Sequence, residues 1–321
     1  MKRSLYRTAT AILSFCLLAV PVFAARELVP VGDLIGLELN SGTLTVAAYD
    51  DTVTAARDAG LRIGDEIISI DGSPVKTPED VRRALNRSDG AIDMIVRRND
   101  ENHEIHLAPA VSAEGPKMGV YLRQGIMGIG TVTFYDPQTG SFGTLGHGVS
   151  DSKGNLLDMT KGYAYDGKIV SIQKGKTGSP GQLKGALEND RPLGELRRNT
   201  PQGVFGTGSE IWNMDAIPVA SADEVCTGPA RIRCTVTEDN PREYSVEILK
   251  IYPATRTDGR NLLIRVTDPQ LLAITGGIVQ GMSGSPIIQD GKLVGAVTHV
   301  LVNDPTTGYG IFIENMLDAA A

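Results

Sequence analysis

The chain has 321 residues, of which 41% are hydrophobic, and its formal net charge is −7. This length and apolar content are enough for two domains with buried cores, and the acidic balance argues against nucleic acid as a partner. Because the chain holds 37 glycines, few aromatic residues and many short β-branched runs, the composition favours a strand-and-turn protein over a helical bundle.

The first 24 residues have the pattern of a bacterial export signal. Three basic residues precede a mostly apolar run at 9–20, and Val22-Phe23-Ala24 resembles a cleavage site. The apolar run is shorter than the ~20 residues that a membrane-spanning helix needs. We therefore expect residues 1–24 to be a signal peptide, or a membrane tether if they are retained, and the chain to be exported across the cytoplasmic membrane.

Residues 33–110 are expected to form a small domain of strands and two helices. The second helix is predicted to begin at Thr77-Pro78-Glu79-Asp80, with Thr as the N-cap, Pro at the first helical position and acids in the first turn. Three short segments resemble the PDZ domains of exported bacterial proteases: Ala59-Gly60-Leu61, Gly64-Asp65-Glu66-Ile67 and Ile70-Asp71-Gly72.

The PDZ resemblance implies a domain that adds a peptide strand to its own sheet edge and captures a terminal carboxylate on backbone N–H groups. It makes Ile35-Gly36-Leu37 the expected carboxylate loop. The ligand would be the C-terminus of another protein or a segment of this chain. The alternative is a PDZ-shaped spacer that binds nothing.

Two cysteines lie outside the expected signal peptide, Cys226 and Cys234, with a turn-like segment between them. In an exported protein this pair could form a hairpin disulfide, and two buried thiols are the alternative. Because the chain has no cluster of His and Cys at metal-ligand spacing, the sequence predicts no metal site.

Residues 117–321 are expected to form a second domain, after a linker at 111–116. Short runs of β-branched and apolar residues alternate with Gly and Pro turns through most of this region, and few stretches keep a helical period. The pattern is typical of an all-β barrel or sandwich.

The loop Gly281-Met282-Ser283-Gly284-Ser285-Pro286 lies between two apolar runs. A small Gly-rich loop can point one hydroxyl outward and leave neighbouring backbone N–H groups unpaired, which is what acyl transfer requires. Ser283 is the predicted nucleophile rather than Ser285, because Gly281 can then supply an oxyanion donor beside the N–H of Ser283. The alternative is an ordinary tight turn.

His147 lies between two glycines after a short strand and is the candidate general base. Asp268 lies between it and the serine loop, which gives the order His, Asp, Ser of chymotrypsin-like proteases. In that chemistry the imidazole takes the proton of the serine and a carboxylate holds the imidazole tautomer. Asp151 and Asp304 are rivals for the carboxylate, and Asp268, which precedes a proline, could instead cap a short helix.

Two regions of the second domain resemble the SpoIVB (stage IV sporulation protein B) peptidase family of endospore-forming bacteria. The first runs from Phe134-Tyr135-Asp136-Pro137 to Leu145-Gly146-His147-Gly148-Val149-Ser150-Asp151. The second runs from the serine loop through Val297-Thr298-His299-Val300 and Asn303-Asp304-Pro305 to Gly308-Tyr309-Gly310. By this resemblance His147 is the base, Ser283 the nucleophile and Asp268 the third member of a triad.

The resemblance implies a mainly β fold, with a chymotrypsin-like double β-barrel after the PDZ domain, and a serine endopeptidase that needs no cofactor. Members of the family are exported from the forespore into the space between two membranes. There they cleave the regulator of a membrane-embedded metalloprotease, which then activates a late sigma factor, and they also cleave themselves. The expected partners are therefore protein or peptide substrates, among them a membrane-anchored regulatory protein.

Two other functions stay open at this level. One is a PDZ-led binding or scaffold protein whose peptidase domain is vestigial. The other is a quality-control protease that degrades unfolded proteins, which would cleave denatured substrates broadly.

Overall fold

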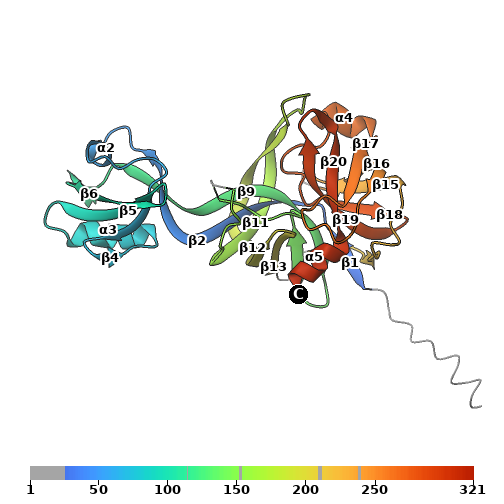
Figure 1. Cartoon of the computed structure of the whole chain (residues 1–321), viewed down its shortest axis with the longest axis horizontal. Helices are drawn as coiled ribbons and strands as arrows, with labels where there is room; N and C mark the ends of the chain where they lie inside the picture. Colours follow the sequence, from blue (N-terminus) through green and yellow to red (C-terminus); the bar gives the residue numbers. More distant parts are fainter. Residues whose placement is uncertain (1–25, 114, 152–153, 209–211, 238–239) are drawn as a thin grey trace, which may run out of the picture.

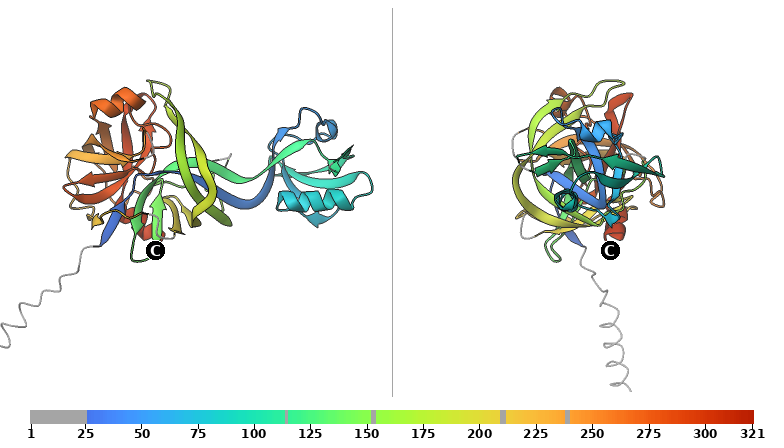
Figure 2. Two further views of the ribbon diagram at one scale, coloured as in Figure 1. Left: turned by 180° about the vertical axis from the view of Figure 1, so that it is seen from behind. Right: turned by 90° about the vertical axis from the view of Figure 1, so that its left-hand side faces the viewer.

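The computed structural model describes residues 26–113, 115–151, 154–208, 212–237 and 240–321, so the predicted export signal at 1–24 lies outside the described residues. A small body and a large body are joined by two long strands, β2 (Leu34–Tyr49) and β9 (Val120–Asp136). These strands pair with each other in antiparallel fashion and enter both bodies, as Figure 1 and Figure 2 show.

The small body is a twisted sheet with the order β9–β2–β3–β5–β6 and two helices. Its elements between the long strands are α2 (Ala55–Asp58), β3 (Glu66–Ile70), β4 (Ser73–Pro74), α3 (Pro78–Arg87), β5 (Ile92–Arg98) and β6 (Glu101–Leu107). Val81 and Leu85 of α3 are buried in its apolar core. The expected linker at 111–116 contains most of a hairpin of β7 (Ala110–Ser112) and β8 (Gly115–Lys117).

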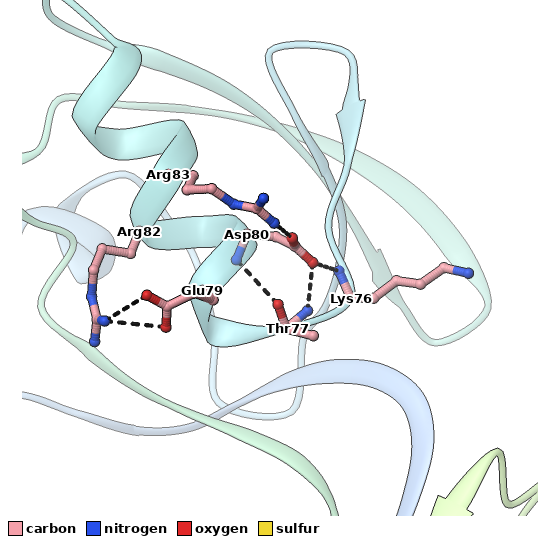
Figure 3. A network of polar contacts seen from close by, with 6 residues as sticks. All are labelled: Lys76, Thr77, Glu79, Asp80, Arg82 and Arg83. Carbon is pink, nitrogen blue, oxygen red and sulfur yellow. Dashed lines mark hydrogen bonds and ion pairs between the residues drawn. The ribbon is translucent and has the colours of Figure 1, made fainter.

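The start of α3 confirms the helix predicted from the sequence (Figure 3). The Thr77 hydroxyl accepts a hydrogen bond from Asp80 N at 3.1 Å, and the Asp80 carboxylate accepts from the backbone N–H groups of Lys76 and Thr77, both at 3.0 Å. These bonds, the one from Lys76 first, lower the pKa of Asp80 to about 2. The local sequence therefore fixes this helix end without help from the rest of the fold.

The first barrel of the large body closes through the long strands. Because β9 pairs with β2 as well as with β10, the strands β9, β10, β13, β12, β11 and β2 form a closed ring. The added members are β10 (Ser141–Thr144), β11 (Lys161–Gln173), β12 (Gln182–Thr200) and β13 (Gly203–Gly208). β1 (Glu27–Pro30) extends the sheet beside β9 and also pairs with β14 (Ile217–Pro218).

The second barrel is closed in the order β15–β16–β17–β20–β19–β18. Its strands are β15 (Gly228–Cys234), β16 (Arg242–Ile251), β17 (Leu262–Val266), β18 (Pro286–Gln289), β19 (Lys292–Leu301) and β20 (Asp304–Phe312). The large body also contains two helices, α4 (Pro269–Thr275) and α5 (Ile313–Ala320). Within the described ranges, no helix has the length and apolar content to cross a bilayer.

The predicted fold class is therefore confirmed: a mainly β chain with a small α+β domain, followed by a chymotrypsin-like pair of barrels. Alternate residues of the barrel strands point into apolar cores, as expected for strands with one buried face. The two barrels lie against each other, and the next sections concern the residues at their junction.

The prediction that Ile35-Gly36-Leu37 forms a carboxylate loop is wrong. These residues lie inside β2, where Gly36 pairs with Tyr165 of β11 on one side and with Ile129 of β9 on the other. Ile35 and Leu37 are 1% and 3% exposed, so the segment has no free edge for a peptide. Its glycine serves packing, because a Cβ on Gly36 would lie 2.1 Å from Leu187 Cδ2.

The small domain was expected to begin at residue 33, but the boundary between the two domains lies within β2. Residues 34–39 of β2 pair with β9 and β11 in the first barrel, whereas residues 44–49 pair with β3 and with the first residues of β9 in the small body. One continuous strand thus belongs to both domains.

The disulfide between Cys226 and Cys234 is absent, since both cysteines are free thiols. Cys226 is exposed and precedes β15, while Cys234 is buried at its far end. A strand rises about 3.3 Å per residue, so β15 separates the two by roughly 20 Å, far beyond the ~7 Å that a disulfide can bridge. Burial raises the pKa of Cys234 to about 12, which keeps its thiol protonated.

Candidate active site

The serine loop lies at the junction of the barrels, directly before β18. It turns through two glycines with positive φ, Gly281 at +100° and Gly284 at +96°. A Cβ on Gly284 would lie 2.0 Å from the carbonyl oxygen of Thr131 in the first barrel. Glycine is therefore required there both for the left-handed backbone and for the close approach of the two barrels.

Two buried threonines of β9 hold this loop. Thr131 donates from its hydroxyl to Gly281 O at 2.8 Å and from its backbone N–H to Ser283 O at 2.9 Å. Thr133 donates from its hydroxyl to Gly284 O at 2.7 Å. The first barrel thus fixes three carbonyl groups of the serine loop, those of Gly281, Ser283 and Gly284, although the loop belongs to the second barrel.

The two serines of the loop have different surroundings. Ser285 is fully buried and donates to Met282 O at 2.6 Å, so its hydroxyl stabilises the turn. Ser283 is only partly buried and lines a cleft of about 610 Å³ between the barrels. Its hydroxyl donates to the carbonyl oxygen of Thr298 on β19 at 2.8 Å. Ser283 is therefore the loop serine that a substrate can reach.

The backbone N–H groups around Ser283 divide into used and unused donors. Those of Met282, Gly284 and Ser285 donate to backbone carbonyls. Within the described part of the chain, those of Gly281 and Ser283 have no acceptor. Two free donors two residues apart, beside an accessible hydroxyl, form the arrangement that stabilises the oxyanion of a tetrahedral intermediate.

His147 reaches the same cleft from the first barrel. It follows β10 after two residues with positive φ, Leu145 at +69° and Gly146 at +68°, which turn the chain sharply. Burial lowers the pKa of His147 below its ordinary value of 6.5. A smaller opposite effect comes from the carbonyl oxygen of Gly148, which lies 2.9 Å from Nδ1. The ring is therefore neutral near pH 7, as a general base requires.

The structure brings Ser283 and His147 into one cleft, but no hydrogen bond joins them. The hydroxyl is bonded to Thr298 and the imidazole to Gly148. Serine–histidine bonds are often long or absent without substrate and form in the substrate complex.

Asp268 is not brought to His147. Its Oδ1 accepts from the backbone N–H groups of Gln270 and Leu271 at 2.9 and 3.0 Å, and its Oδ2 accepts from Ser245 N at 3.3 Å. It is the N-cap of α4, the alternative that the following proline had left open. The prediction that Asp268 orients the imidazole is therefore not supported by the geometry.

The two rival carboxylates also have other partners. Asp304 accepts hydrogen bonds from Thr306 and Thr307 at the tight turn between β19 and β20. Asp151 accepts from Asn155 N at 2.9 Å within its own loop. Neither carboxylate lines the cleft that contains Ser283 and His147.

Sequence reasoning gave no role to the residue whose ring does lie beside His147. The rings of His147 and His299 have centroids 5.3 Å apart and are tilted by 39°. His299 Nδ1 is buried, and in the described residues it has no hydrogen-bond partner. Burial, then His147 and Arg260, lower the pKa of His299 to about 4, against a smaller opposite effect of Asp258. The available signal was its position in the distinctive stretch Val297-Thr298-His299-Val300.

The described residues contain no group of three or more His, Cys, Asp or Glu side chains arranged to hold a metal ion. The donors that converge on the cleft are a hydroxyl, two imidazoles and two backbone N–H groups. That set is suited to acyl transfer through a serine.

One family model matches more than half of this chain. A family model described as SpoIVB peptidase S55 matches residues 114–317, and a PDZ domain model matches residues 52–98. A protein of Agrobacterium fabrum named as a zinc metalloprotease (Atu1380) is 30% identical over 176 residues, which is 52% of this chain and 45% of that protein. Serine protease HTRA1 of Xenopus laevis is 38% identical over 72 residues, 22% of this chain and 15% of that protein. The chain thus spans less than half the length of either curated relative.

Among solved structures, the active form of the Rv3671c protease from M. tuberculosis aligns with 61% of this chain and 75% of that chain, at 16% identity and a TM-score of 0.38. The PDZ domain of an SdrC-like protein from Listeria monocytogenes aligns with 25% of this chain and 85% of that chain, at 24% identity and a TM-score of 0.22.

Proposed function

We propose that Ser283 is the nucleophile and His147 the general base of a serine peptidase. The chain belongs to the SpoIVB peptidase S55 family. The observation that carries this assignment is the pair of free backbone donors, Gly281 N–H and Ser283 N–H, beside the one loop hydroxyl that lines the cleft shared with His147. Protein or peptide substrates follow from the peptidase family and the PDZ domain.

The proposed reaction proceeds through an acyl-enzyme. The Ser283 hydroxyl exchanges its bond with Thr298 O for one with His147 Nε2, and its oxygen attacks the scissile carbonyl carbon as the proton passes to the imidazole. The oxyanion of the tetrahedral intermediate accepts from Gly281 N–H and Ser283 N–H. The C–N bond then breaks, and His147 returns the proton to the leaving amine. Water repeats the sequence to release the acid and restore Ser283.

A serine-directed fluorophosphonate tests the site without knowledge of the substrate. We expect the folded protein to be labelled, Ser283→Ala to lose the label, and His147→Ala to be labelled at least about 10²-fold more slowly. Ser150→Ala is the matched control, because Ser150 lines the same cleft and is exposed. Labelling that survives in Ser283→Ala would overturn the assignment. A folded wild type that takes no label would favour the PDZ-led scaffold.

We further propose that the chain is exported, cleaves itself, and signals during endospore formation by cleaving a membrane-anchored regulator, so that a membrane-embedded metalloprotease activates a late sigma factor. The signal-like sequence of the first 24 residues and membership of the family support this role. The long strands β2 and β9 hold the PDZ domain apart from the two barrels (Figure 1), an arrangement suited to capturing one part of a substrate and cleaving another.

Complementation separates the signalling role from the peptidase activity. In an endospore-forming host that lacks its own family member, the wild-type chain should restore heat-resistant spores and Ser283→Ala should not. If neither restores spores while the purified wild type is still labelled, the developmental role fails and the peptidase assignment stands. Broad cleavage of denatured proteins by the wild type would instead favour a quality-control protease.

A further inference from the structure

His147 needs an acceptor for its Nδ1 proton if its Nε2 is to accept the proton of Ser283. In this structure Nδ1 bonds to the carbonyl of the next residue in the chain, Gly148. A local backbone carbonyl can fix a tautomer, but it holds the ring in relation to its own loop and not to β19 or the serine loop. The ring must be held across the junction of the barrels, since Ser283 lies on the second barrel.

The carboxylates proposed for this task are engaged elsewhere. Asp268 caps α4 and Asp304 holds a turn. The charge of Asp258 raises the pKa of His299 slightly. Both carboxylate oxygens of Asp258 accept hydrogen bonds from the Arg256 guanidinium at 2.8 Å. The side chain with a ring against His147 is His299, at a centroid separation of 5.3 Å.

His299 has the chemistry of an acceptor. Its Nδ1 is shielded from solvent and unpartnered in the described structure, and leaving such an atom unsatisfied costs about 1–3 kcal/mol. A buried polar atom without a partner beside a functional group calls for an explanation. His299 also follows Thr298, whose carbonyl holds the Ser283 hydroxyl, so β19 places both contacts next to each other in the chain.

We infer that His299 is the positioning residue of the site: in the active arrangement His147 Nδ1–H donates to His299 Nδ1, which completes a Ser283–His147–His299 triad. This inference rests on the proposed function. The bond requires His299 to be neutral with its proton on Nε2. The lowered pKa of His299 meets this requirement, because its imidazole stays uncharged above about pH 4.

Two amide variants test which ring nitrogen matters. The oxygen of His299→Asn can replace the Nδ1 acceptor, whereas the amide of His299→Gln reaches the position of Nε2. We expect the fluorophosphonate labelling rate of His299→Asn to stay within about tenfold of wild type and that of His299→Gln to fall about 10²-fold. With a peptide substrate the loss should appear in kcat and not in KM. Equal labelling rates for the two variants would overturn the inference.

The pH profile gives a second readout that a purely structural role would not move. The wild-type labelling rate should rise with pH as His147 loses its proton. Without the acceptor the imidazolium of His147 is less stable, so its pKa falls and the midpoint of the profile should move to lower pH in His299→Gln. An unchanged midpoint would count against the inference. If the wild type takes no label, the proposed function fails as well, whereas a labelled wild type with equal Asn and Gln variants overturns the role of His299 alone.

Discussion

The Ser283 hydroxyl donates a 2.8 Å hydrogen bond to the carbonyl oxygen of Thr298 and not to His147. Among the described residues, neither oxyanion donor has an acceptor while this bond is made. The site therefore differs from a reactive arrangement in two side-chain contacts, that of the serine and that of the imidazole, and not in the backbone of the loop. A substrate carbonyl placed in the oxyanion hole would draw the hydroxyl from Thr298 toward His147, while the imidazole exchanges its contact with Gly148.

The threonine contacts from the first barrel should control this loop. Thr131→Val keeps the shape of the side chain but leaves Gly281 O, a buried acceptor, without the hydroxyl donor. We expect the free energy of unfolding to fall by about 1–3 kcal/mol and the labelling of Ser283 to slow, because the peptide next to an oxyanion donor is released. Chemical denaturation and fluorophosphonate kinetics measure the two effects.

Thr144→Val is the matched control for that experiment. The Thr144 hydroxyl is also buried and donates to Thr131 O at 2.6 Å, and within the described residues it makes no hydrogen bond to the serine loop. It should cost a similar amount of stability and keep most of the labelling rate. If both variants slow labelling equally, the effect comes from general loosening of the barrel and not from the contact with Gly281.

Asp268 offers a direct comparison of capping with catalysis. Asn is as good an N-cap as Asp but carries no charge, so Asp268→Asn should keep labelling and should lose only the stability of the 3.3 Å contact with Ser245 N–H. Asp268→Ala removes the acceptor of the Gln270 and Leu271 N–H groups and should lower the free energy of unfolding by about 1 kcal/mol. A folded Asp268→Asn protein whose labelling falls 10²-fold or more would restore the carboxylate as the third catalytic member.

The sequence predicted that the serine loop and His147 belong to one site because their signals are local, and both residues line one cleft. Small residues around one hydroxyl, or glycines on both sides of one imidazole, describe a turn that exposes a reactive group, and such a turn is largely specified by its own residues. The capping box at Thr77 is equally local. The third member of the site is not local, because it depends on which side chains of β19 and of the loop after β10 meet across the junction.

The carboxylate loop was misplaced for a related reason. An apolar–Gly–apolar segment is compatible with a PDZ carboxylate loop and with a barrel strand in which glycine admits a neighbour. Gly36 belongs to the second kind, since it makes room for Leu187. Only the continuity of β2 through both bodies, a property of 16 residues and their partners, distinguishes the two.

His299 should make stability depend on pH in the mildly acidic range. Unfolded His299 takes up a proton near pH 6.5, but folded His299 stays neutral down to about pH 4. Between these values the unfolded state binds more protons, so stability falls as the pH is lowered from 6.5 to 4. The groups that face His299 are His147, Arg260 and Asp258. Burial also lowers the pKa of His147, so its contribution to the pH dependence has the same sign as that of His299.

Denaturation of wild type and His299→Asn at several pH values measures this dependence. The free energy of unfolding should fall more steeply with decreasing pH in the wild type than in the variant. The difference in slope should be below ~1.4 kcal/mol per pH unit, because His299 is only partly buried and solvent screens it. Above pH 7 the difference between the two proteins should be constant. Parallel curves down to pH 4 would show that His299 titrates normally and is not enclosed with His147.

The close approach of the barrels at Gly284 should make this glycine more sensitive to substitution than Gly291. Gly284 and Gly291 both belong to the second barrel and both have positive φ, +96° and +75°. An added Cβ on Gly291 meets nothing within 4 Å, whereas one on Gly284 would lie 2.0 Å from Thr131 O. Gly291→Ala should therefore cost only the left-handed strain, about 1 kcal/mol, and keep labelling of Ser283. Gly284→Ala must in addition separate the serine loop from β9, so it should lose several times as much stability and its label, as measured by denaturation and fluorophosphonate kinetics. Similar losses of stability and labelling in the two variants would mean that backbone strain, and not the contact between Gly284 and Thr131, sets the geometry of the nucleophile.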